Sequence, residues 1–180
     1  IGYPVVLKLV SDDVQHKSDV GGVLIGLRNG QEVREGFAGI AASLAAAKPG
    51  AHFGGALVVQ QVSGGTELVL GVHRDPEVGL VTMFGTGGVL LELVKDVAFG
   101  PVPLSEAQAA EMIDRTMAGR LLDGYRGGAK LDRAAVINAL VGLSHLAQDL
   151  GERLESIDVN PLTALPSGAL ALDGLVVLKA

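Results

Sequence analysis

The chain has 180 residues, nearly half of them apolar, and a formal net charge of −6, so it can bury a substantial core as one domain or as two small lobes. Its positive charges are scattered singly, which argues against a surface for nucleic acid or anionic membranes, and no apolar run approaches the length of a membrane span. Because it has no cysteine, the chain forms no disulfide and no thiolate metal site, which fits a reducing compartment, and we expect it in the cytoplasm.

The beginning of the chain is expected to form a long β-hairpin followed by one amphipathic helix. Apolar residues dominate 4–10 and 20–28, and the polar loop between these two runs carries His16. Asn29 marks a turn and a helix cap, and apolar residues then recur at helical spacing as far as Lys48. The pattern therefore predicts two antiparallel strands and a helix that ends near Lys48.

Short strands dominate the middle of the chain. Glycine and proline turns separate apolar runs that we expect to be strands, at 56–62, 66–73, 78–84 and 89–94. The glycine-rich segment 85–88 follows the third of these runs and could offer backbone N–H groups to phosphate. It lacks the spacing of a Walker A loop, however, and no helix is predicted directly after it, so a tight turn explains it better.

The pattern changes to helix after two prolines near residue 101. Ser105 and Gln108 form a capping-box sequence for a helix that reaches about Met117, and Asp132 is placed to cap a longer helix. The apolar residues of the longer helix recur on one face, which we expect to be buried. This stripe comprises Val136, Ile137, Leu140, Leu143, Leu146 and Ala147.

The chain ends in two apolar runs that read as a β-hairpin. The strands are expected at 154–162 and 169–178, joined by a turn at 165–168. Strands and helices are thus partly segregated along the chain, and their alternation is irregular. This order predicts an α+β protein rather than a doubly wound parallel sheet.

One lysine stands in the middle of the first apolar run. Lys8 has aliphatic residues on both sides in the sequence, and a lysine is costly to bury unless an anionic group meets it. We interpret Lys8 as the first sign of a phosphate site.

The C-terminal hairpin carries a second chemical signal. Asp158 and Asn160 share one face of their strand because residues two apart point the same way. If the turn closes on Ala164 and Ala169, Asn160 lies directly opposite Asp173, with Cβ atoms roughly 5 Å apart. Such an oxygen-rich cluster suits Mg²⁺, which takes few protein oxygens and completes its shell with phosphate and water. The alternative is a solvent-facing strand pair with polar side chains.

The four histidines differ in their surroundings. His52, His73 and His145 have no partner at metal-ligand spacing, so we interpret them as structural or surface residues. His16 lies in a polar loop that offers no packing reason for a histidine. Taken alone, it is compatible with a catalytic or a surface role.

Seven separated motifs carry a resemblance to a known family. In order they are GYPVVLK, HKSDVGGV, ELVLGVHRDPEVG, MFGTGGVLLELVKDVAF, GYRGG, SIDVNPL and ALDG. Together they resemble the ATP-grasp domain of the NDP-forming acyl-CoA synthetases, which include ADP-forming acetyl-CoA synthetase and are relatives of the succinyl-CoA synthetase β subunit. The resemblance covers essentially the whole chain. It implies an ATP-grasp fold in which a smaller lobe, 1–59, and a larger lobe, 60–180, clamp a nucleotide between antiparallel sheets.

The resemblance also implies roles for individual residues that bind ATP or ADP. Lys8 matches a lysine that contacts the nucleotide phosphates, Glu67 an acidic residue near the ribose, and Arg74 a contact on the phosphate side. The segment that holds adenine through its backbone is matched by Val59, Gln60, Gln61 and Val62.

Metal binding and phosphoryl transfer are implied for the remaining site residues. Asn160 and Asp173 match Mg²⁺ ligands, in agreement with the hairpin argument. His16 matches a histidine thought to accept a phosphoryl group and carry it on a swinging loop, and Asp158 an acidic residue that orients or stabilises a phosphohistidine. We expect the glycines that follow, Gly21 and Gly22, to be the compliant end of that loop.

The implied reaction converts an acid, CoA and ATP into acyl-CoA, ADP and phosphate. The CoA-binding and ligase domains, on the same polypeptide or on a partner subunit, would bind CoA and the small carboxylic acid, and the full-length protein is expected to be oligomeric. One departure is Ser156, where many members have glutamate. Two alternatives remain: a silent nucleotide-sensing domain, like the synthetase-like regions fused to protein acetyltransferases, and a carboxylate ligase working through an acyl phosphate.

Overall fold

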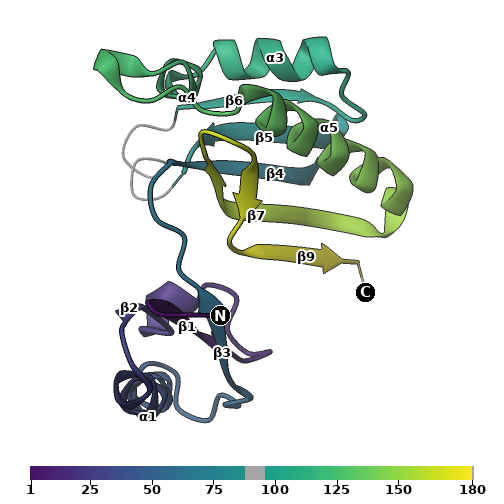
Figure 1. Cartoon of the computed structure of the whole chain (residues 1–180). Coiled ribbons are helices and arrows are strands. Elements are labelled where there is room, and N and C mark those ends of the chain that lie inside the picture. Colours follow the sequence, from purple (N-terminus) through teal and green to yellow (C-terminus); the bar gives the residue numbers. More distant parts are fainter. Residues whose placement is uncertain (88–95, 180) are drawn as a thin grey trace. The chain divides into compact units, whose positions relative to one another are not determined.

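The computed structural model describes residues 1–87 and 96–179, and the strand expected at 89–94 lies outside them (Figure 1). The chain divides into two compact units, Ile1–Ser63 and Gly64–Ala180, called here the N-terminal and C-terminal units. Both contain antiparallel strands and at least one α-helix, so the expected α+β class and ATP-grasp fold agree with the architecture. That the functional lobes are 1–59 and 60–180 remains a prediction.

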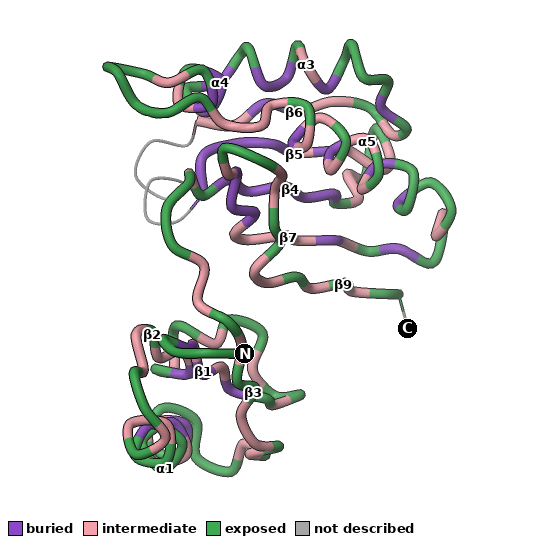
Figure 2. Tube along the Cα trace, viewed as in Figure 1, coloured by how far each residue is buried: buried purple, intermediate pink, exposed green. Residues whose placement is uncertain are grey.

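The N-terminal unit is a three-stranded antiparallel sheet with one long helix. The sheet order is β2-β1-β3, so the expected hairpin of the first two strands is confirmed. Four aliphatic side chains from the sheet and the helix form its buried core, Leu7, Leu9, Ile40 and Leu44 (Figure 2). The elements are β1 (Val5–Val10), β2 (Val23–Leu27), α1 (Gly30–Ala47) and β3 (Gly55–Gln60), with a 3₁₀ turn at Lys17–Val20.

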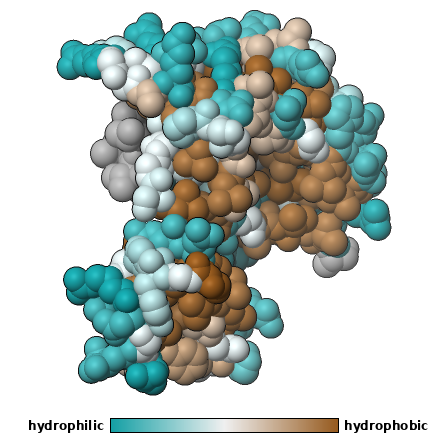
Figure 3. Space-filling view, in the orientation of Figure 1, coloured by the Kyte–Doolittle hydropathy of each residue, from teal (hydrophilic) through white to brown (hydrophobic). Residues whose placement is uncertain are grey.

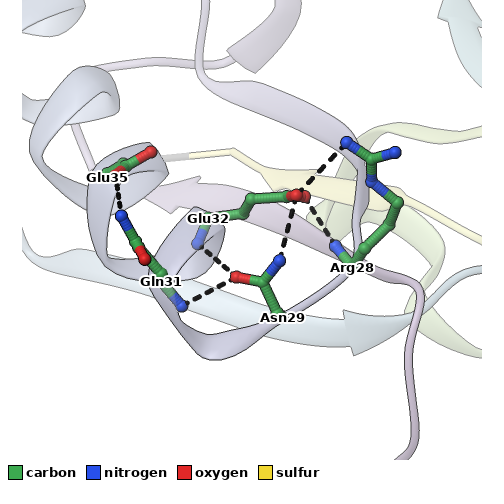
Figure 4. Close-up of polar contacts among 5 residues, drawn as sticks. All are labelled: Arg28, Asn29, Gln31, Glu32 and Glu35. Carbon is green, nitrogen blue, oxygen red and sulfur yellow. Dashed lines mark hydrogen bonds and ion pairs between the residues drawn. The ribbon is translucent and has the colours of Figure 1, made fainter.

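Helix α1 begins where the sequence predicted its cap. The side-chain oxygen of Asn29 accepts hydrogen bonds from the backbone N–H groups of Gln31 and Glu32, both at 3.0 Å (Figure 4). Glu32 in turn accepts the N–H of Arg28 at 2.8 Å, and this bond holds the pKa of the Glu32 carboxyl below its ordinary value. The reciprocal bonds satisfy N–H groups that a helix start leaves without partners.

The C-terminal unit is a six-stranded antiparallel sheet with helices packed on one of its faces (Figure 1). The strand order is β6-β5-β4-β7-β8, and β9 also pairs with β7. Its elements are β4 (Thr66–Asp75), β5 (Gly79–Thr86), β6 (Val97–Pro101), α3 (Glu106–Asp114), α4 (Met117–Leu122), α5 (Arg133–Leu150), β7 (Leu154–Ala164), β8 (Ala169–Ala171) and β9 (Gly174–Leu178), with 3₁₀ turns at Tyr125–Gly127 and Gly151–Arg153.

The main core lies between the sheet and the helices. Phe84 of β5 and Leu68 and Leu70 of β4 meet Ile113 and Leu140 of the helices, and all five are fully buried. Apolar residues are also found on the surface, over β7 and β9, as Figure 3 shows. Among the described residues, no helix is long and apolar enough to cross a membrane.

Two expectations for the helical region are wrong. The helix expected to reach about Met117 ends at Asp114, and a separate helix, α4, begins at Met117, whose N–H donates to the carboxylate of Asp96 at 2.7 Å. Leu146 is 45% exposed and is not part of the buried stripe. Its place is taken by Ser144, which is fully buried because its hydroxyl accepts the N–H of Leu104 at 2.9 Å.

Candidate functional site

The C-terminal hairpin has the register that the sequence argument assumed. Ala164 pairs with Ala169, and beyond an interruption in the second strand Val159 pairs with Gly174 in the same register. Within the interruption the N–H of Leu172 still donates to the carbonyl oxygen of Pro161 at 2.9 Å. The same offset on both sides places Asn160 across from Asp173.

The strand that carries Asn160 is also irregular on its other side. Leu70 of β4 pairs with Val159, but the next pair is Leu68 with Leu162, so β7 contains one extra residue at this level. Such a bulge changes the direction of a side chain and is common beside active sites. Asn160, therefore, lies at a break in both of the hydrogen-bonded ladders that flank β7.

The donor set of this hairpin fits Mg²⁺. Asn160 and Asp173 are both half-buried and offer one amide oxygen and one carboxylate. No group of three or more His, Cys, Asp or Glu side chains suited to a metal occurs within residues 1–87 and 96–179. A cation that keeps several ligands from phosphate and water needs no such group, whereas a structural zinc ion would.

Asp158 lies one step along β7 from this pair. It is half-buried and faces Gly71 of β4 on one side and Leu175 of β9 on the other. A Cβ on Gly71 would lie 3.9 Å from a carboxylate oxygen of Asp158 and 3.4 Å from the terminal methyl of Met83. Both distances are ordinary van der Waals contacts, so Gly71 lies directly beside these two side chains. Nothing in the sequence pointed to Gly71 or Met83, because their relation to Asp158 depends on strand pairing.

Arg74 lies at the other end of β4, and its guanidinium is used within the C-terminal unit. It donates to the carbonyl oxygens of Leu154 at 3.1 Å and Gly151 at 2.8 Å, and it pairs with Glu152 at 3.4 Å. The side chain is only 17% exposed. These contacts join β4 to the turn between α5 and β7. A phosphate contact by Arg74 stays a prediction that this geometry does not favour.

The glycine-rich segment 85–88, which begins inside β5, is a site of close packing as far as it is described. A Cβ on Gly85 would lie 2.5 Å from the carbonyl oxygen of Asp96, and one on Gly87 would lie 2.9 Å from backbone atoms of Leu68. The N–H of Gly87 donates to the carbonyl oxygen of Glu67 at 2.9 Å. Close backbone contacts therefore account for the glycines at both positions. The side chain of Glu67 is exposed and accessible to a ligand.

Lys8, His16 and Gln60 belong to the N-terminal unit. Lys8 is half-buried rather than buried, since the strand alternation turns Leu7 and Leu9 toward the core and Lys8 to the other face. The initial reason for singling it out, a charge inside a core, is therefore wrong, although the residue lies on a firmly paired central strand. His16 is exposed and immediately precedes the 3₁₀ turn.

The segment expected to hold adenine begins at the end of β3. Gln60 pairs with Val5 of β1, and Gln61 and Val62 follow the strand. The side-chain oxygen of Gln61 is buried and has no hydrogen-bond partner among the residues that the structure describes. A buried acceptor without a donor is costly, so this segment fits a ligand that brings an N–H group, as the exocyclic amine of adenine does.

Gly22 was expected to belong to a flexible end of the loop that carries His16, but close packing holds it in place. A Cβ on Gly22 would lie 2.7 Å from the carbonyl oxygen of Lys17 and 2.8 Å from Cβ of Leu9. The N–H of Gly22 donates to that Lys17 oxygen, and its own carbonyl accepts the N–H of Leu9, both at 2.7 Å. The glycine is needed for close packing, and this end of the loop is fixed to β1.

Comparison with known proteins agrees with this architecture. A model of the ATP-grasp domain matches residues 1–178. The chain belongs to this family. The β subunit of ADP-forming acetate–CoA ligase I of Pyrococcus furiosus is 39% identical over 99% of the chain, which covers 76% of that subunit. The single-chain ADP-forming acetate–CoA ligase I of Archaeoglobus fulgidus is 42% identical over 99% of the chain, which covers only 26% of its length.

Solved structures lead to the same group of enzymes. An acetyl-coenzyme A synthetase 1 of Ca. Korarchaeum cryptofilum, in complex with coenzyme A and Ca-AMPCP, matches 99% of this ATP-grasp chain and 78% of its own with 41% identity and a TM-score of 0.93. Another structure of that protein contains Mg-AMPPCP and a phosphohistidine segment that points towards the nucleotide-binding site. The chain is thus an ATP-grasp domain homologous to ADP-forming acid–CoA ligases, as the sequence motifs indicated.

Proposed function

We propose that this ATP-grasp domain binds the nucleotide and transfers its phosphoryl group in an ADP-forming acyl-CoA synthetase. The overall reaction would be acid plus CoA plus ATP giving acyl-CoA, ADP and phosphate. The observation that carries the proposal is the hairpin register, which sets Asn160 across from Asp173 with Asp158 beside them. Oxygen ligands of this kind suit the Mg²⁺ that accompanies nucleotide phosphates.

The nucleotide would be held by groups from several strands. Asn160 and Asp173 would bind Mg²⁺, which when bound supplies positive charge to the phosphate oxygens. Lys8 would donate to a phosphate and Glu67 would accept from the ribose. The backbone of 60–62 would hold adenine, and the buried acceptor of Gln61 would gain a partner. Arg74 is left out of this set because its guanidinium joins β4 to the start of β7.

His16 would be the nucleophile. A neutral imidazole nitrogen attacks the terminal phosphorus, an N–P bond forms, the bond from that phosphorus to the bridging oxygen breaks, and ADP leaves with the electron pair. Only the neutral imidazole has a ring nitrogen with a lone pair free to attack, and the exposed side chain of His16 leaves that nitrogen accessible. Asp158 would stabilise the phosphohistidine by accepting from the other ring nitrogen.

The remaining steps would take place on other parts of the enzyme. The chain covers 26% of the single-chain ligase of Archaeoglobus fulgidus, and the rest of such a protein would contribute the CoA-binding and ligase domains. We propose that CoA and a small carboxylic acid bind there, that the full-length protein is oligomeric, and that it works in the cytoplasm. A second candidate function, a silent nucleotide sensor, is favoured only by Ser156, where many family members have glutamate.

The test is phosphohistidine formation in the complete protein. Incubation with ATP labelled on the γ-phosphate should give acid-labile, alkali-stable label on His16, dependent on Mg²⁺. The variant His16→Ala should bind nucleotide normally but take up no label, and His52→Ala, a matched change in the same unit, should label as wild type. Absence of label in the wild type, or equal label in His16→Ala, would contradict the relay.

A further inference from the structure

Hydrogen bonds hold the beginning of the loop that carries His16 next to the C-terminal end of helix α1. The carboxylate of Asp13 accepts the backbone N–H of His52 at 2.7 Å, and its carbonyl oxygen accepts from the ammonium group of Lys48 at 2.5 Å. The N–H of Asp13 donates to the hydroxyl of Ser11 at 3.3 Å. Asp13 thus makes three hydrogen bonds although it is exposed.

The end of the same loop is fastened to strand β1. Gly22 exchanges hydrogen bonds with Lys17 and Leu9 and has no room for a side chain. Between the two fastened points, Val14 and Val20 pack against the core of the N-terminal unit. His16 lies between these two valines and is itself exposed.

We propose that Asp13 is the pivot of the histidine loop, a positioning residue that limits how far His16 can travel. The proposal rests on the proposed function, in which His16 carries a phosphoryl group. With Asp13 and Gly22 both fixed, only 14–21 can move while the rest of the N-terminal unit stays folded.

The length of chain between pivot and histidine sets the reach. His16 is three residues from Asp13, and an extended chain spans at most about 3.3–3.6 Å per residue. Its Cα therefore stays within about 11 Å of the Cα of Asp13, and two positions of the histidine can differ by at most about 22 Å. A fixed pivot keeps the imidazole at a high local concentration near its targets, because short tethers give the largest effective concentrations.

Breaking the pivot should loosen the loop without removing any group that touches a phosphate. In Asp13→Ala the N–H of His52 loses its acceptor, so the segment 14–21 should open more often. Asp13→Asn keeps an acceptor oxygen and should behave as wild type. Lys48→Met removes the hydrogen bond from the other side, because the ammonium group no longer donates to the carbonyl oxygen of Asp13, and it serves as a second, independent variant. Asp12→Ala is the matched control, because the neighbouring Asp12 is exposed and makes no hydrogen bond or ion pair with any described residue.

The first measurement is hydrogen–deuterium exchange in the complete protein. The amides of Asp19 and Gly21, which donate to carbonyl oxygens within the loop at 3.2 and 3.1 Å, should exchange about 10-fold faster in Asp13→Ala and Lys48→Met. Amides of β1 should not change. Exchange in both variants equal to that of Asp12→Ala would overturn the pivot.

The second measurement is the rate at which labelled ATP phosphorylates His16. We expect a decrease of roughly 3- to 10-fold in Asp13→Ala, with unchanged nucleotide affinity and recovery in Asp13→Asn. Faster exchange with an unchanged labelling rate would overturn the positioning role. If the wild type takes up no label, the relay itself fails, and the exchange comparison still decides whether Asp13 is a pivot.

Discussion

Replacing Arg74 separates a structural role from a phosphate-binding role. In Arg74→Met the apolar stem is retained, but the hydrogen bonds to Gly151 and Leu154 are lost. Hydrogen bonds that involve a charged group contribute about 1.5–3 kcal/mol each, and the pair with Glu152, which is 89% exposed, contributes about 0–1 kcal/mol. Allowing for water that replaces part of these bonds, we expect the free energy of unfolding to fall by about 2–4 kcal/mol.

Urea denaturation followed by circular dichroism measures this loss, and nucleotide affinity is measured on the same samples. Arg115→Met is the matched control, because Arg115 is exposed and makes no side-chain bond with the described residues, and it should change stability by less than about 0.5 kcal/mol. Glu152→Gln should likewise cost less than about 1 kcal/mol. The reasoning is refuted if Arg74→Met keeps wild-type stability while its affinity for ATP falls about 10-fold or more.

Three further changes test other parts of the fold and site. Asp173→Ala should weaken Mg²⁺-dependent nucleotide binding about 10-fold or more by calorimetry, and unchanged binding would contradict the metal assignment. Backbone N–H groups of α5 and of the β7–β8 turn hold the pKa of Asp132 below its ordinary value. Its stabilising contribution is therefore complete above about pH 4 and lost as the pH falls further, so unfolding of Asp132→Asn should depend less steeply on pH below about pH 4. Gly22→Ala should cost about 1–3 kcal/mol because its Cβ meets β1, whereas Gly39→Ala, in open space on α1, should stabilise by about 0.5–1 kcal/mol.

The features that the sequence predicted well depend on neighbouring residues. Asn29, Ser105 and Asp132 cap their helices because a cap needs only the side chain and the next three N–H groups. The hairpin register follows in the same way from a short turn and from strand alternation, which is why the sequence alone places Asn160 across from Asp173.

The features that the sequence missed depend on distant partners. Strand β6 and the separate helix α4 were not predicted, and the first N–H of α4 is accepted by Asp96, 21 residues earlier. The bonds of Arg74 reach carbonyl groups 77 and 80 residues away. Burial of Ser144 requires the N–H of Leu104, which lies 40 residues before it. Propensity and periodicity carry no information about such pairs.

The break between β8 and β9 would let a rigid sheet present the proposed ligands to a cation. Continuous pairing would hold both strands flat, but here the ladder stops at 172–173, opposite a bulge of β7. At this level Pro161 has no N–H to donate, and the carboxylate of Asp173 accepts the N–H of Gly174 at 3.2 Å. The paired residues on either side set the distance between Asn160 and Asp173, so hairpin stability and cation affinity are thermodynamically coupled. A cation bound there would therefore stabilise the hairpin, because a ligand that binds only the folded arrangement shifts the equilibrium toward it.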